Sequence, residues 1–152
     1  MRIVQDAGAD YITVHGRTRS QRSSTPPDYD AIRKLRPHIS VPMFANGDAY
    51  TLADVNRIAE ATLADGVMAA RGMLESPAMF KGVSSTPAEC VRDFVAWAVR
   101  CPIPFPLVLH HVGEMTGRMP GMTKKQRRAL MDCRDMLDLL DFVEDRWALE
   151  TP

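Results

Sequence analysis

The stretches YITVHGRT (residues 11–18), VPMFANGD (residues 41–48) and DGVMAARG (residues 65–72) follow one pattern. Each is a short β-prone apolar run that ends in a polar or glycine-containing turn, and a helical pattern follows each one. Consecutive β/α units of a parallel barrel have this pattern, and such barrels place ligand groups where the strands end. The three stretches therefore predict parallel strands with a ligand site at their carboxyl ends.

The strands are expected over residues 11–15, 41–45 and 66–70, with helices between them. Tyr29, Ile32 and Leu35 share one face of a helix predicted over residues 28–36. Thr51 can cap the next helix, and a short helix is expected around residues 72–80.

The pattern becomes helical throughout after residues 82–85. Capping boxes are predicted at residues 86–89, with proline at the first helical position, and at residues 123–126. The second box is expected to open one long helix whose inward residues are Leu130, Cys133, Leu137, Leu140 and Trp147. The prediction is therefore a β/α part over residues 1–83 and a helical domain over residues 84–152.

Size and composition limit the fold and the class of protein. The chain has 152 residues, 45% apolar and 25% charged, whereas a complete eight-unit α/β barrel needs about 250. We therefore expect a partial TIM (β/α)8 barrel, its last three units, in a chain truncated at its beginning. A net charge of zero gives no whole-chain attraction for nucleic acid. No apolar run approaches the roughly 20 residues of a membrane span, and no signal peptide is evident.

The number and spacing of the cysteines and histidines indicate neither a metal site nor a disulfide bond. Cys90, Cys101 and Cys133 are odd in number and widely spaced, which favours a reducing intracellular compartment. His110 and His111 are adjacent on a predicted helix and point in different directions, so they do not chelate a metal.

Two of the strand-end turns suit a phosphate group. The turn at residues 70–72 exposes backbone N–H groups where a helix begins, and residues 46–48 offer further donors at the preceding strand end. Phosphate sites are common at such positions in barrels. The alternative is that both are ordinary tight β/α turns.

Three groups of cationic or titratable residues are candidates for ligand contact. His15 lies at a strand end, where it can donate to a ligand or act as acid or base, although a structural role is the alternative. The loop beyond it carries Arg17, Arg19 and Arg22, which suit a polyanion or form a solvated loop. Cations at the start of a helix oppose its dipole, which suggests RNA phosphate or a solvated surface for Lys124, Lys125, Arg127 and Arg128.

The ordered motifs V-H-G-R-T, N-G-D and D-G-V-M-x-x-R-G, followed by a helical domain, resemble the flavin-dependent tRNA-dihydrouridine synthases. The stretches over residues 110–117 and 123–140 look most like the eukaryotic branch that acts on uridines 20a and 20b. The resemblance implies an FMN-binding barrel, a helical tRNA-binding domain and reduction of the uridine C5–C6 bond with NADPH or NADH. It also implies a cytoplasmic or nuclear protein.

The resemblance assigns roles to particular residues. By position, the flavin-binding residues are His15, Asn46, Gly47, Asp48, Ala70, Arg71 and Gly72. Arg17 is expected near flavin or RNA, with Arg19 and the four cations of residues 124–128 on RNA. Ala70 replaces the family's glycine, so weaker flavin binding is expected there at most. The family's catalytic cysteine, in an Asn-x-Gly-Cys-Pro loop, has no counterpart here, so no catalytic residue is assigned.

The expected function is a dihydrouridine synthase portion that is inactive alone. Three parallel strands cannot close a barrel, so the chain is expected to self-associate through the open edge, which gel filtration would reveal. The alternatives are a non-catalytic RNA-binding module, another phosphate-binding barrel enzyme, and a gene fragment without a function of its own.

Overall fold

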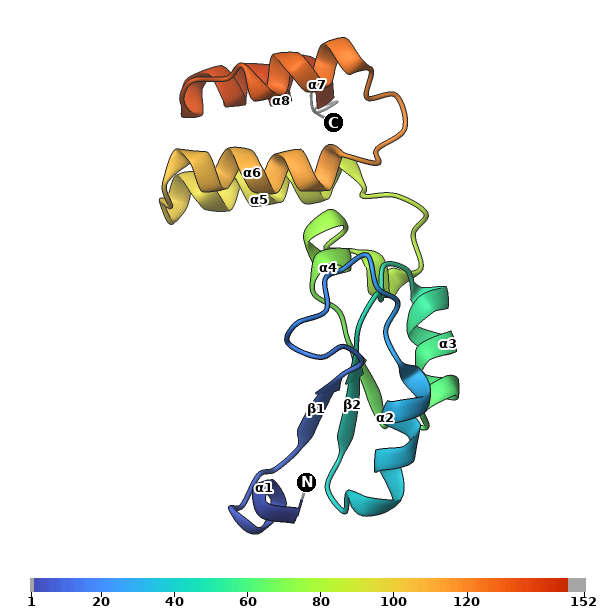
Figure 1. Ribbon diagram of the computed structural model, residues 1–152. Helices are drawn as coiled ribbons and strands as arrows, with labels where there is room; N and C mark the ends of the chain where they lie inside the picture. The colour runs from blue at the N-terminus through green and yellow to red at the C-terminus, as the bar shows by residue number, and fades with distance from the viewer. Residues whose placement is uncertain (1, 148–152) are drawn as a thin grey trace. The chain divides into compact units, whose positions relative to one another are not determined.

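The computed structural model describes residues 2–147 of the chain. These residues form two compact units, which divide between Met73 and Leu74, inside helix α4 (Arg71–Glu75). The first unit contains the β-strands, and the second consists of helices and connecting loops (Figure 1). Each unit is described by itself below.

A three-stranded parallel sheet is the centre of the first unit, in the spatial order β1-β2-β3. Its strands are β1 (Ile12–His15), β2 (Met43–Asn46) and β3 (Gly66–Met68). The register places His15 opposite Asn46, and Asn46 opposite Met68. The prediction of three parallel strands is confirmed, and their carboxyl ends lie side by side at one edge of the sheet.

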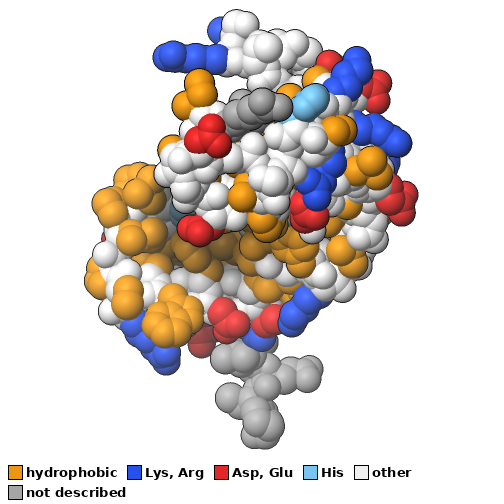
Figure 2. Space-filling view, turned by 90° about the horizontal axis from the view of Figure 1, so that it is seen from below, with side chains coloured by type: hydrophobic (Ala, Val, Ile, Leu, Met, Phe, Trp, Pro, Cys, Tyr) orange, Lys and Arg blue, Asp and Glu red, His pale blue; other side chains and the backbone are white. Residues whose placement is uncertain are grey.

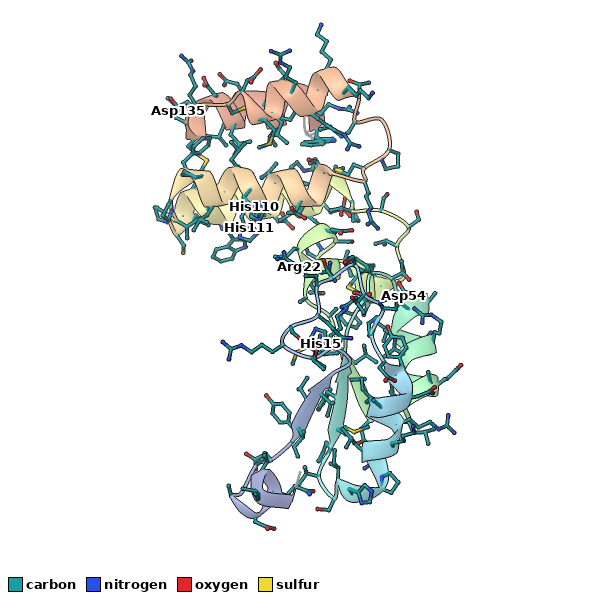
Figure 3. All side chains as sticks on the ribbon, in the orientation of Figure 1. His15, Arg22, Asp54, His110, His111 and Asp135 are labelled. Atoms are coloured by element: carbon teal, nitrogen blue, oxygen red, sulfur yellow. The ribbon has the colours of Figure 1, made fainter. Side chains whose placement is uncertain are left out.

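The helices of this unit begin at the caps that the sequence offers. They are α1 (Arg2–Asp6), α2 (Tyr29–Leu35) and α3 (Leu52–Thr62), with a 3-10 turn over Arg36–His38. The Asp28 carboxylate accepts the N–H of Ala31 at 2.8 Å to start α2. At the start of α3, Thr51 and Asp54 form a capping box, because each side chain bonds the other's backbone N–H. Asp54 is labelled in Figure 3.

Only one face of the sheet is covered by helices of its own unit (Figure 1). Ile12, Met43 and Ala45 on that face pack with Ile32 of α2 and Ile58 of α3. Fully burying such a side chain contributes about 1.5–3 kcal/mol each, so this layer is the core of the unit.

The other face of the sheet carries Tyr11, Phe44 and Met68. The rings of Tyr11 and Phe44 meet edge to face, with centroids 5.5 Å apart. Tyr11 is 58% exposed and Met68 43% exposed. Hydrophobic side chains are also seen at the surface in Figure 2. An apolar sheet face is therefore open.

Four α-helices make up most of the described part of the second unit. They are α5 (Ala88–Arg100), α6 (Phe105–Thr116), α7 (Lys124–Met131) and α8 (Met136–Trp147), preceded by a 3-10 turn over Met79–Lys81. Fully buried Val91, Val108, Val112, Leu130 and Leu139, at least one from each of these helices, meet in its core. No helix within residues 2–147 is long and apolar enough to cross a bilayer.

Two of the expected helix details are wrong. The hydroxyl of Thr86 donates to the carbonyl of Glu75 instead of capping α5, which starts from Pro87 without a side-chain cap. The long helix expected from residue 123 is broken, because the Asp135 carboxylate accepts the N–H groups of Leu137 and Asp138 and starts a new helix there. As a result Leu137, expected inward, is 71% exposed.

The capping box at Thr123 and Gln126 is confirmed. The division between units falls about ten residues before the boundary expected at residue 83. Glu75 explains part of this difference, because its carbonyl bonds Thr86 and its carboxylate pairs with Arg118 at 3.1 Å. These contacts tie the segment after Met73 to the helical unit.

We predict that Asp135→Ala lowers the free energy of unfolding of the helical unit by about 1 kcal/mol, because two N–H groups at the start of α8 lose their acceptor. Both tryptophans, Trp97 and Trp147, lie in this unit, so urea unfolding followed by tryptophan fluorescence reports on it alone. Asp132→Ala is the matched control, since it removes only an exposed ion pair with Arg128. Equal midpoints for the two variants would contradict the capping role.

Candidate functional site

The two turns that the sequence singles out for phosphate border one pocket at the carboxyl ends of β2 and β3. Its lining is Asn46, Asp48, Ala49, Tyr50, Met68, Ala70, Arg71 and Gly72. Parallel strands bring their carboxyl ends to the same edge, so two turns more than twenty residues apart become neighbours. All of these residues belong to the first unit.

Gly72 allows the two turns to approach each other. A methyl group at this position would overlap the carbonyl oxygen of Ala49 and would lie 2.8 Å from the Cα of Tyr50. No side chain fits there, because these obstructing atoms belong to the backbone and cannot move aside as a flexible side chain does. Ala70 is different: among the described non-glycine residues only Asp48 and Leu63 have positive φ, so Ala70 adopts an ordinary conformation.

Gly47 is the second position that needs glycine. Its φ of 140° lies in a region that residues with a Cβ rarely adopt. An added Cβ would also lie 3.0 Å from Cγ of Pro27, which belongs to the loop after β1. The turn at residues 46–48 is therefore packed against that loop as well as against the turn at residue 72.

His15 and Asn46 are opposite each other at the ends of β1 and β2. The Asn46 amide donates to the carbonyl of Met68 at 2.8 Å, which joins β2 to β3 beyond their ladder. The Nδ1 atom of His15 accepts the backbone N–H of Arg17 at 3.1 Å. In the neutral ring the proton then resides on Nε2, which leaves the exposed His15 with an N–H donor for a ligand.

Asp48 lies between two arginines. Its carboxylate accepts from Arg17 through one oxygen and from Arg71 through the other, the latter at 2.8 Å. The Arg71 guanidinium also lies over the ring of Tyr50, 5.3 Å from its centroid. Asp48 and Arg71 are the charged residues of the pocket lining, and the Arg17 guanidinium neutralises Asp48 from outside that lining. The Arg71 guanidinium, at 47% exposure, is the cation that an anion could meet there.

The side chain of Arg17 is only 6% exposed. Besides Asp48, its guanidinium donates to the carbonyl of Thr25 and, at 3.2 Å, to that of Ser23. This placement argues against the expected contact with RNA, because its N–H groups are turned inward to the protein. Arg19 and Arg22, on the same loop, are exposed. Arg22 is labelled in Figure 3.

Two tyrosines, which the sequence analysis did not identify as site residues, support the site. The Tyr29 hydroxyl donates to the carbonyl of Gly47 at 2.9 Å. Burial raises the pKa of Tyr29 above its ordinary value, against the opposing effect of nearby Arg57, so the phenol stays a protonated donor. Tyr50 lies beneath Arg71. Tyr29 is eighteen residues from the turn it supports, and no local pattern signals such a contact.

Four basic residues of the second unit lie in the first part of α7. Lys124, Lys125, Arg127 and Arg128 are all exposed, and no acidic residue lies in the first turn of this helix. Arg128 approaches Asp132 at 3.7 Å in an exposed pair, which contributes little to stability. These cations are accessible to a polyanion.

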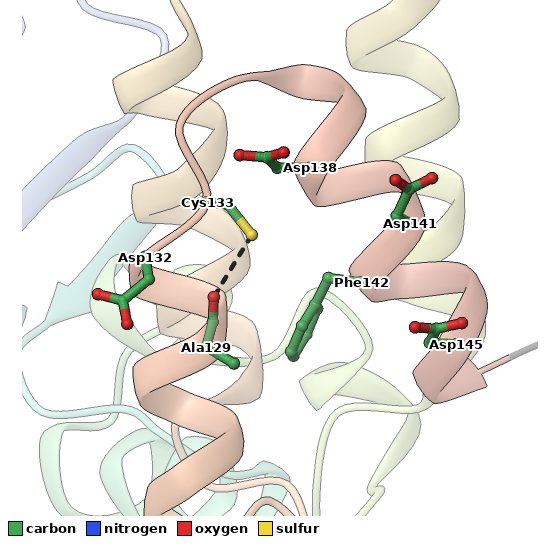
Figure 4. A pocket seen from close by; sticks show the side chains of 7 residues that line it. All are labelled: Ala129, Asp132, Cys133, Asp138, Asp141, Phe142 and Asp145. Atoms are coloured by element: carbon green, nitrogen blue, oxygen red, sulfur yellow. Dashed lines mark hydrogen bonds between the residues drawn. The ribbon is translucent and has the colours of Figure 1, made fainter.

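The second unit has a hollow that is lined mainly by acidic residues. It lies between α7 and α8 and is lined by Asp132, Cys133, Asp138, Asp141 and Asp145 together with Ala129 and Phe142 (Figure 4). Burial and the neighbouring carboxylates raise the pKa of the Cys133 thiol, whose Sγ donates to the carbonyl of Ala129 at 3.5 Å. A thiol in this state is a poor nucleophile.

Metal ligation has no candidate among residues 2–147, where no three His, Cys, Asp or Glu side chains gather suitably. The rings of His110 and His111 have centroids 5.6 Å apart, and His111 meets Phe94 edge to face. His111 thus packs as an aromatic side chain.

The chain belongs to the dihydrouridine synthase (Dus) family, whose model matches residues 1–143. It is 39% identical over 152 residues to a Schizosaccharomyces pombe protein and 42% identical over 141 residues to one from Saccharomyces cerevisiae, both named tRNA-dihydrouridine(20a/20b) synthase [NAD(P)+]. A human protein named as like this enzyme is 34% identical over 143 residues. The alignments cover 100%, 90% and 93% of this chain but only 46%, 38% and 44% of those proteins. The chain thus spans less than half the length of these relatives.

We predict that Gly72→Ala destabilises the first unit by about 1–3 kcal/mol, since the added methyl group forces the two turns apart. The control is Ala70→Gly, two residues away in the same turn, which is expected to cost less than about 1 kcal/mol because it relieves no strain. Thermal unfolding followed by circular dichroism measures both. A Gly72→Ala variant as stable as the parent chain would show that the close approach is not needed.

Proposed function

We propose that this chain supplies the phosphate-binding side of a flavin site in a tRNA-dihydrouridine synthase. The enzyme would reduce the C5–C6 bond of uridine in the tRNA D-loop with FMN and NADPH or NADH. The observation that supports the proposal is that the turns at residues 46–48 and 70–72 border one pocket, where the half-exposed Arg71 guanidinium is held by Asp48. Family membership and the words NAD(P)+ in the names of the relatives agree with it.

The residues of the pocket suit a phosphate monoester. Arg71 is 47% exposed, and Asp48 is bonded through only one of its guanidinium nitrogens, so further N–H donors remain to meet an anion. The close packing at Gly72 keeps side chains away from the backbone that a phosphate would approach. His15 would donate its Nε2 proton to an acceptor of the bound group. When bound, FMN supplies the chemistry of taking hydride from the nicotinamide and giving it to uridine.

We also propose that β1, β2 and β3 are three strands of an eight-stranded barrel. The uncovered face with Tyr11, Phe44 and Met68 would then line the barrel interior. The 152 residues by themselves leave this face and the strand edges open, so we expect them to self-associate and to lack activity. No described residue is assigned as the proton donor to uridine.

The exposed cations of α7 would bind tRNA phosphate. Local charge matters here, because the net charge of the whole chain is zero. The second candidate function, a non-catalytic RNA-binding module, rests on the same surface and requires no flavin. Family membership disfavours a barrel enzyme for a small metabolite.

The flavin proposal predicts that the chain binds FMN more tightly than riboflavin, which lacks the phosphate. Arg71→Gln is expected to weaken FMN binding by about tenfold and to leave riboflavin unchanged, since it removes a charge-assisted contact to phosphate only. Flavin fluorescence titration measures both affinities. Arg33→Gln, on exposed α2 of the same unit, is the control. Equal affinity of the parent chain for the two flavins would overturn the phosphate assignment.

The RNA proposal predicts a weaker salt dependence of tRNA binding when cations of α7 are removed. Each lost phosphate contact is expected to reduce the slope of log K against log salt by about 0.7–0.9. Filter binding at several salt concentrations compares Lys124→Gln/Lys125→Gln with the matched pair Arg33→Gln/Lys34→Gln on α2. If both pairs change the slope equally, α7 has no special role, and an RNA-binding module built on this surface is excluded.

A further inference from the structure

The loop between β1 and α2, residues 18–27, is held at its base by the strand ends. The N–H of Asp28 donates to the carbonyl of Gly16 at 2.7 Å, which closes the loop. Pro27 lies against both Gly16 and Gly47: an added Cβ would be 2.7 Å from Pro27 Cβ at Gly16, and 3.0 Å from Pro27 Cγ at Gly47. The loop is thereby packed onto the turn that borders the pocket.

Arg17 holds the loop from inside. Its guanidinium spans the carbonyl groups of Ser23 and Thr25 and continues to the carboxylate of Asp48. Such a contact needs the planar, multiply donating guanidinium, since an ammonium group cannot reach three acceptors in this arrangement. The buried side chain of Arg17 thus joins the loop to the turn at residues 46–48.

Asp48 has a positive φ, and its carboxylate lies between two arginines. Its φ of 51° lies in the left-handed region, which aspartate and asparagine adopt more readily than other residues with a Cβ. A carboxylate beside a phosphate is electrostatically unfavourable by itself. Its presence in an anion pocket therefore needs an explanation, and the two arginines that it joins provide one.

We propose that Asp48 is a positioning residue that couples the loop of residues 18–27 to the phosphate site. One carboxylate oxygen orients Arg71 over Tyr50 and toward the pocket, and the other fixes Arg17 and with it the loop. The loop, which carries exposed Arg19 and Arg22, then forms an ordered wall beside the strand ends. This inference rests on the proposed phosphate site for its ligand but not for the coupling itself.

Asp48→Asn is the decisive variant, because asparagine keeps the left-handed backbone, removes the charge and replaces one of the two acceptor oxygens with an NH2 donor. If Asp48 positions Arg71, affinity for FMN falls about tenfold while riboflavin binding is unchanged. If Asp48 were merely a nearby negative charge, its removal would strengthen FMN binding. The sign of the change separates the two roles, and an unchanged or higher FMN affinity overturns the positioning of Arg71.

Limited trypsin digestion of the ligand-free chain tests the coupling without any flavin. Cleavage after Arg19 and Arg22 is expected to be about tenfold faster in Asp48→Asn and in Arg17→Lys than in the parent chain, because opening of the loop controls access. Cleavage after Arg33 and Lys34 of α2 is the internal reference for intact folding. Unchanged loop cleavage in both variants overturns the coupling.

Asp65→Asn is the matched control for charge. Asp65 lies at the opposite end of the sheet, where it accepts the N–H of Met43 at 2.8 Å and pairs with Arg36 at 3.3 Å. Its replacement removes a carboxylate from the same unit and is expected to change neither loop cleavage nor the ratio of FMN to riboflavin affinity. If the parent chain bound no FMN and Asp48→Asn still accelerated loop cleavage, the flavin assignment would fail and the coupling would stand.

Discussion

The carboxylate of Asp48 holds together the three strand ends on which the candidate site depends. Unit charges 4 Å apart attract by about 1 kcal/mol in bulk water and about 4 kcal/mol near a protein surface. The Asp48–Arg17 pair belongs to the stronger class, because Arg17 is almost fully removed from solvent. Exposed pairs such as Arg128–Asp132 contribute between zero and 1 kcal/mol. Loss of Asp48 would leave the buried Arg17 guanidinium without a counter-charge, which costs more than the loss of an exposed pair of the helical unit.

Around this ion pair, backbone packing determines what can approach the pocket. Gly72 brings the start of α4 against Ala49 and Tyr50, and Gly47 admits Pro27. The first contact is between backbone atoms, and the second is between Gly47 and the side-chain ring of Pro27, so neither glycine adds a side chain at the pocket. A binding site for an anion needs positive charge and accessible donors, and the half-exposed Arg71 offers both. Ala70 is not among the described residues with positive φ, so its backbone conformation does not require the glycine of the family pattern.

The pocket and the charged helices lie in different units. The β/α unit holds the pocket, and the helical unit presents cations at the start of α7 and carboxylates along α8. A net charge of zero hides this separation, since charges of opposite sign lie on neighbouring helices. The chain breaks at Asp135, where a new helix begins, so the cations and the carboxylates lie on separate helices. Electrostatic arguments for RNA binding thus apply to a helix rather than to the chain.

Local pattern in the sequence was sufficient for the parallel strands, for the caps at Thr51 and Thr123, and for the two turns that border the pocket. These features depend on residues within a few positions of one another, where periodicity and capping chemistry act directly. The ion pairs of Asp48, the support of Gly47 by Tyr29 and the inward turn of Arg17 could not be predicted this way. They join residues eighteen or more positions apart, or depend on how a loop closes. Sequence alone thus determined which groups reach the strand ends, and the tertiary structure decided which of them line the pocket and which are paired and buried, because burial and charge pairing arise only when distant segments meet.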